Sequence, residues 1–210
     1  MKRMTTLLLA LMLLPALAMG ATFQLKPDLK VTLPDLAAPW VASTEPPAEL
    51  VEHLTEHVLE EAAAQGKTPT TEQARAAAMK RARSNQLFVA NPESGAHLLI
   101  SFSPLEQGET APSAKTVARS AEIAADGVAD EGWAEVKTEQ SATTVKGAQQ
   151  AQWFTIDYRH EGERSQFLGI VGFAKPYWFW FYGNDHLKNP ADRAVLEKVM
   201  RGIDIQIQAP

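Results

Sequence analysis

The sequence contains no cysteine among its 210 residues, which excludes disulfides, thiolate metal ligands, thiol nucleophiles and lipid attachment at an N-terminal cysteine. Glycine and proline are sparse, at 12 and 13 residues, so a low-complexity or collagen-like chain is excluded as well. Basic residues are not in excess, because 20 Lys and Arg stand against 25 Asp and Glu, a formal net charge of −5. Broad electrostatic binding of nucleic acid is therefore not expected.

Long apolar runs are also missing, except near the N-terminus. Two basic residues precede an apolar run at Leu7–Leu14, and the small residues Ala18 and Gly20 follow it. This order is typical of a secretory signal peptide, and the run is shorter than the roughly 20 residues that span a bilayer. We expect residues 1–20 to be a signal peptide cleaved after Gly20 or after Ala18, with an uncleaved N-terminal anchor as the alternative. The mature protein is then exported, most simply to a bacterial periplasm, and has no transmembrane segment.

Removal of the signal peptide would leave 18 basic against 25 acidic residues, a net charge of −7. The mature chain, residues 21–210, is long enough to bury roughly 70% of its unfolded surface without disulfides. We therefore expect a single domain. Its acidity favours a basic partner, because opposite charges steer association.

Residues 46–85 predict a helical hairpin inserted near the N-terminus. Pro46 and Pro47 can begin a helix, which carries an apolar stripe at helical spacing and ends at Gly66. A second helix, at residues 74–84, follows a capping signal. The first helix is rich in glutamate and the second in arginine and lysine. These charges favour antiparallel pairing, although each surface ion pair contributes only ~0–1 kcal/mol.

The rest of the chain predicts an α+β domain, in which a largely antiparallel sheet is sandwiched by helices. Hairpin-like spacing of the strands indicates the antiparallel order. Strands are predicted at 23–31, 86–90, 96–103, 133–138, 143–146, 151–158, 166–173, 177–182 and 203–207, and helices at 113–130 and 190–202.

The segment from Tyr177 to Tyr182 is the most unusual, because all six residues are aromatic. Side chains alternate along a strand, so three rings point to each face of the sheet. Either helices cover both faces, or one face stays open as a docking surface. The candidate binding residues are Trp153 and Tyr158, expected on the neighbouring strand, and Trp178, Trp180 and Tyr182.

Two glycines, Gly169 and Gly172, lie inside a predicted strand. Glycine there often marks the close approach of a bulky ring. We expect these positions to make room for Trp178 and Trp180 on the next strand.

Three segments of the chain carry a family resemblance: QLFVANPESGAHLLISFS, QWFTIDYRHEGERSQFLGIVGFAKPYWFWFYG and PADRAVLEKVMRGIDIQI. Together they resemble the PsbP-like α/β/α sandwich, a fold shared with a yeast Ran-binding protein and with the effector-associated chaperones of type VI secretion. The resemblance covers roughly residues 86–207. It implies binding of other proteins rather than catalysis, no cofactor, and an insertion at residues 46–85.

One catalytic motif is present in the first helix. His53, Glu56 and His57 match H-x-x-E-H; histidines four apart can both reach one zinc ion, and Glu56 could act as general base. The resembling metalloproteases have a third acidic ligand on a second helix, where this chain offers only Glu72. We therefore expect a solvated helix face, and adventitious metal binding by His53 and His57 is the alternative.

These observations lead to three functional hypotheses. The first is an exported, non-catalytic protein-binding protein, either an immunity or inhibitor protein against a secreted toxin or an assembly factor for an envelope complex. The second is a small-ligand carrier with Trp153, Trp178 and Trp180 lining an apolar pocket. The third is a zinc hydrolase that uses His53 and His57.

Overall fold

The structure, a computed structural model, describes residues 20–129, 134–160, 162–185 and 189–208. The expected signal peptide, apart from Gly20, lies outside the described residues. A helix with the length and apolar character needed to cross a membrane is absent from the described part of the chain.

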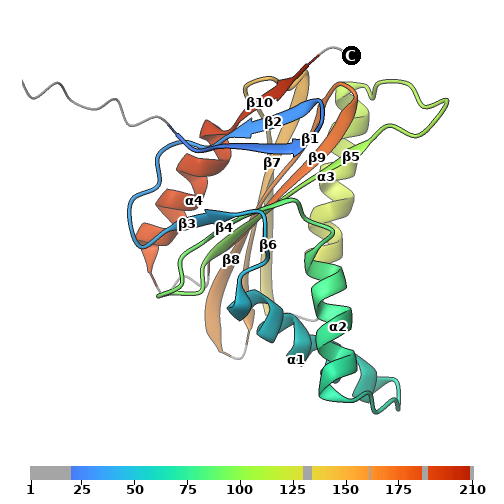
Figure 1. Cartoon of the computed structure of the whole chain (residues 1–210), viewed down its shortest axis with the longest axis vertical. Helices are drawn as coiled ribbons and strands as arrows, with labels where there is room; N and C mark the ends of the chain where they lie inside the picture. The colour runs from blue at the N-terminus through green and yellow to red at the C-terminus, as the bar shows by residue number, and fades with distance from the viewer. Residues whose placement is uncertain (1–19, 130–133, 161, 186–188, 209–210) are drawn as a thin grey trace, which may run out of the picture.

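A seven-stranded sheet forms the centre of the molecule, with helices on both of its faces (Figure 1). Every strand pair in this sheet is antiparallel, which confirms the predicted α+β class. In spatial order the strands are β3 (Val41–Ser43), β4 (Leu87–Ala90), β5 (His97–Pro104), β9 (Tyr177–Asp185), β8 (Glu163–Ala174), β7 (Gln150–His160) and β6 (Ala134–Thr143).

A smaller, three-stranded sheet consists of β1 (Thr22–Lys26), β2 (Leu29–Thr32) and β10 (Asp204–Ile207). The prediction of one strand over residues 23–31 was wrong, because Pro27 and Asp28 form a turn that makes a hairpin. The prediction of separate strands at 133–138 and 143–146 was also wrong. No glycine or proline interrupts residues 137–143, and they pair with β7 in continuous register.

The helices cover the two faces of the large sheet unequally. Helix α4 (Pro190–Gly202) and the small sheet pack on one face, here called the α4 side. Helix α3 (Ala114–Ala129) packs over β7 and β8 on the opposite face, the α3 side. Helices α1 (Ala48–Ala64) and α2 (Thr71–Ala82) pack against each other and lie at the lower end of the view in Figure 1. An exposed ion pair of 3.1 Å between Arg81 and Glu61 joins these two helices.

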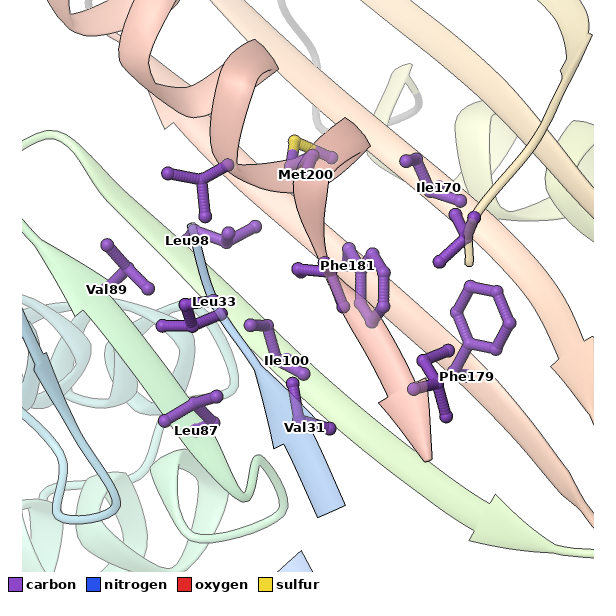
Figure 2. Packing of buried hydrophobic residues seen from close by; sticks show 14 of the residues in the cluster. Val31, Leu33, Leu87, Val89, Leu98, Ile100, Ile170, Phe179, Phe181 and Met200 are labelled. Carbon is purple, nitrogen blue, oxygen red and sulfur yellow. The ribbon is translucent and has the colours of Figure 1, made fainter. Parts of the chain in front are cut away.

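The main hydrophobic core lies on the α4 side. Figure 2 shows Phe179 and Phe181 of β9 among aliphatic side chains from the neighbouring strands, with Met200 of α4 above them. Both phenylalanines are fully buried, and their rings stack at 4.8 Å. This layer fixes β9 as a rigid central strand.

The two strand glycines make room for rings other than the expected tryptophans. A Cβ on Gly169 would lie 2.1 Å from the Phe154 ring of β7, and one on Gly172 would lie 2.2 Å from the Phe179 ring of β9. Our expectation that they accommodate Trp178 and Trp180 was therefore wrong. Both glycines are needed for close packing inside the sheet layers.

Candidate binding surfaces

Three aromatic side chains of β9 form a partly exposed row on the α3 side. Trp178, Trp180 and Tyr182, here called the aromatic strip, are half-buried, whereas the alternate residues of β9 face the α4 side and are buried. The predicted division of the six rings between two faces is thus what the structure has. The Trp178 and Trp180 rings are stacked, with centroids 6.1 Å apart and planes inclined by 21°.

The strip is half-buried because its two flanks differ. Helix α3 packs on β7 and β8, the strands on one side of β9. On the other side, strand β5 places Ser103 directly opposite Trp178 and Ser101 directly opposite Trp180. Serine is too small to cover an indole, so the two tryptophans of the strip stay partly open along this flank, whereas Tyr182 lies opposite Leu99. The sequence predicted either that helices cover both faces of β9 or that one face stays open. The aromatic strip on the α3 side is intermediate, because it is neither fully covered nor fully open.

Tyr182 is the polar member of the strip, and its ring packs against Phe167 at a centroid distance of 5.4 Å. Burial raises the pKa of the Tyr182 phenol to about 12. The phenol is therefore neutral at ordinary pH, and the strip is an uncharged aromatic surface with one hydroxyl.

The structure does not bring all five predicted binding residues together. Trp153 and Tyr158 lie on β7, which is separated from β9 by β8, so the expectation of a neighbouring strand was wrong. Tyr158 shares the α3 side with the strip but is only 6% exposed. Trp153 belongs to the core cluster on the α4 side.

The predicted carrier pocket is overturned by the same geometry. Trp153 lies on one face of the sheet, and Trp178 and Trp180 lie on the other. The three indoles cannot line one cavity, because the sheet stands between them.

A polar cleft of about 320 Å³, here called the Trp153 cleft, is present on the α4 side. Its floor comes from β6 and β7 and its wall from α4, where three charged residues recur at every fourth position. The Arg201 guanidinium lies 4.4 Å from the centroid of the Trp153 ring, close enough for a cation–π interaction. The lining residues are Glu139, Gln140, Ser141, Trp153, Thr155, Arg193, Glu197 and Arg201.

Sequence reasoning missed this cleft, although part of its signal was visible. The spacing of Arg193, Glu197 and Arg201 predicts one charged face of a helix, and Arg193 Nε donates to Glu197 Oε1 at 3.0 Å. What the sequence does not supply is the position of Trp153 beneath that face, because this depends on how α4 crosses the sheet.

The two histidines of the H-x-x-E-H motif lie together on α1. Their Nε2 atoms are 3.1 Å apart, and His57 Nδ1 lies 3.7 Å from a carboxylate oxygen of Glu60. The pair could share a metal ion as far as its spacing is concerned. Within the described ranges, however, there is no group of three or more His, Cys, Asp or Glu side chains placed to hold one.

The described residues thus define a PsbP-like sandwich that displays an aromatic strip on one face and a polar cleft on the other. Two solved structures are similar to this chain. LpqN of Mycobacterium tuberculosis, described as involved in cell envelope biogenesis, is 13% identical with a TM-score of 0.50, and the match covers 86% of each chain. The cyanobacterial PsbP (CyanoP) of Synechocystis sp. PCC 6803 is 9% identical with a TM-score of 0.45, over 91% of this chain and 95% of that one. No protein-family model and no curated protein matches the sequence.

The likeness to LpqN confirms the PsbP-like fold that the sequence resemblance predicted. At this level of identity it concerns the fold alone. Function has to be argued from the surfaces.

Proposed function

We propose that this chain is an exported, non-catalytic protein-binding protein of the cell envelope, located in the periplasm. The aromatic strip is the observation that carries the proposal. Large rings supply much contact area with little loss of side-chain entropy, and tryptophan and tyrosine are enriched among residues that dominate binding energy. Here the rings stand on a strand held rigid by the buried layer behind it, so little ordering is needed on binding.

The partner we propose is another exported or envelope protein of basic character. The chain has an excess of acidic residues, with a formal net charge of −5, which favours fast association with a positively charged surface. An assembly factor for an envelope complex is the version that LpqN, with its described involvement in cell envelope biogenesis, supports. An immunity or inhibitor protein against a basic exported toxin is the other version, and the identity of the partner distinguishes them.

Affinity capture from an envelope extract tests the proposal. The full chain, tagged at its C-terminus, is compared with the double variant Trp178→Ser/Trp180→Ser. Ile123→Ser is the matched control, because it removes a large apolar side chain that is 57% exposed on α3, outside the strip. We expect a stoichiometric protein partner with the parent chain and the control, and its loss with the double variant. A partner that the double variant retains, or no partner in any sample, contradicts the proposal.

The non-catalytic part of the proposal has its own test. The double variant His53→Ala/His57→Ala, which removes both histidines of the motif in α1, should capture the same partner in the same amount. Metal-dependent turnover that a chelator abolishes, and that disappears in this variant, would establish the hydrolase instead.

The Trp153 cleft favours a second candidate function, the binding of a small polar ligand. Its volume of about 320 Å³ is within the range of small-molecule sites, and charged groups of both signs line it. Native mass spectrometry of the purified chain should then show a bound small molecule that is lost in Arg201→Ala. A mass equal to that of the bare chain in both samples rejects this candidate.

A further inference from the structure

Strand β6 forms one edge of the large sheet and is long for an edge strand. It has ten residues, and all but Val136 and Thr143 are exposed. The strand at the opposite edge, β3, has only three residues. Within the described ranges β6 pairs with β7 on one side, and no strand pairs with its outer edge. A row of backbone N–H and C=O groups is therefore available for pairing.

Only the first part of this edge carries a protective irregularity. The β6–β7 register shifts between Ala134 and Lys137, where Glu135 has a φ of 54°, in the left-handed region. Such a bulge interrupts pairing locally. From Lys137 to Thr143 the register is continuous and contains no proline. The regular segment can accept another strand.

The side chains of this segment carry two opposite charges on the same side of the sheet. Lys137 and Glu139 lie opposite Asp157 and Thr155 of β7, on the α4 side, and Thr138 stands between them on the other side. Neither charge has an ion-pair partner among the described residues. The edge is thus self-complementary: a second copy offers a carboxylate for the lysine and an ammonium for the glutamate.

We propose that β6 pairs with β6 of a second copy of this chain, antiparallel, about a two-fold axis through Thr138. Directly opposed residues of an antiparallel pair point to the same side of the sheet, so the axis must pass through a residue. An axis at Lys137 or at Glu139 would oppose like charges. An axis at Thr138 opposes Lys137 of each copy with Glu139 of the other.

This arrangement has the properties of a closed symmetric dimer. The same patch serves both copies, as an isologous interface requires, and the ion pair occurs twice. An axis at Gln140 would oppose Glu139 with Ser141 and form no ion pair. Cross-strand pairs of opposite charge, together with the central threonine pair, favour the register through Thr138 over the alternatives.

Charge exchange tests this register. The molecular mass of the full chain is followed over a range of concentrations by analytical ultracentrifugation, together with Lys137→Glu, Glu139→Lys and the double exchange Lys137→Glu/Glu139→Lys. Each single variant opposes like charges and should raise the dimer dissociation constant about tenfold. The double variant re-forms both ion pairs and should return to within about threefold of the parent chain. Lys80→Glu, an exposed charge reversal on α2, is the matched control and should leave the dimer unchanged.

Three outcomes overturn the proposal: a parent chain that stays monomeric at every concentration, a dimer that neither single variant weakens, and a double variant as weak as the single ones. Far-ultraviolet circular dichroism shows whether each variant is folded. Amide hydrogen exchange provides a second readout, because the amides of β6 that point outward should become protected as the parent chain dimerises.

Discussion

Gly169→Ala should destabilise the protein strongly, although it adds a single methyl group. The new Cβ would lie 2.1, 2.2 and 2.6 Å from three ring atoms of Phe154, well inside an ordinary contact of 3.4 Å or more. The ring would have to retreat by more than an ångström. It has little free space for this, because Phe154 is fully buried and its ring packs against both Phe167 and Tyr182, with centroid distances of 6.1 and 6.3 Å.

Overpacking of a filled core costs typically about 1–3 kcal/mol, and three simultaneous clashes place this variant near 3 kcal/mol. For a chain of this length the melting temperature should fall by about 6–12 °C. Urea unfolding followed by tryptophan fluorescence gives the free energy directly. In Gly169→Ala/Phe154→Leu the shorter side chain relieves the clash. The double variant should therefore lose about 1–2 kcal/mol less unfolding free energy than the two single variants lose in sum.

Gly127→Ala is the matched control. Gly127 is an exposed residue of α3, and no atom lies within 4 Å of the position that a Cβ would take there, so alanine should add up to about 1 kcal/mol of stability. A Gly169→Ala variant within about 0.5 kcal/mol of the parent chain, or strict additivity in the double variant, would refute the packing argument.

Two further predictions concern buried and half-buried polar groups. Asp192→Ala removes the carboxylate oxygen that accepts a hydrogen bond from Asn91 Nδ2 at 2.9 Å. Because Asp192 is only 3% exposed, the free energy of unfolding in urea should fall by about 1–3 kcal/mol. The loss should be smaller for Asp192→Asn. Burial raises the pKa of Tyr177 and Tyr182 to about 12, and a hydrogen bond to Asp28 adds to the effect at Tyr177. The unfolded phenols ionise first, at a pKa of about 10, so stability should be level below pH 10 and decline between pH 10 and 12; an absorbance titration in which both phenols ionise near pH 10 in the folded protein would contradict this.

The sequence predicted the architecture well where the pattern is local. The alternation of rings along β9 gave the correct division between two faces, because side-chain direction in a strand depends only on parity. The helix starts at Pro47 and Asn189 were predictable for the same reason: a cap or a first-turn proline acts within a few residues.

The surfaces could be predicted only in part, because they depend on which strands become neighbours. The sequence placed Trp153 and Tyr158 beside the aromatic strip, but β8 lies between β7 and β9. The same non-local order explains why Gly169 accommodates Phe154 rather than a tryptophan. Strand order is determined by the packing of the whole sheet, and no short pattern in one strand encodes it.

The residues on the two faces of β9 are constrained to different degrees by their packing, although they alternate along one strand. Phe179 and Phe181 are held by close packing on every side, so few replacements are tolerated there. Trp178 and Trp180 alternate with them but are half-buried, and on the β5 flank each faces only a serine. Under the binding function proposed above, substitutions at these two positions should change partner preference while the scaffold stays intact, which makes this strand a suitable place to redesign recognition.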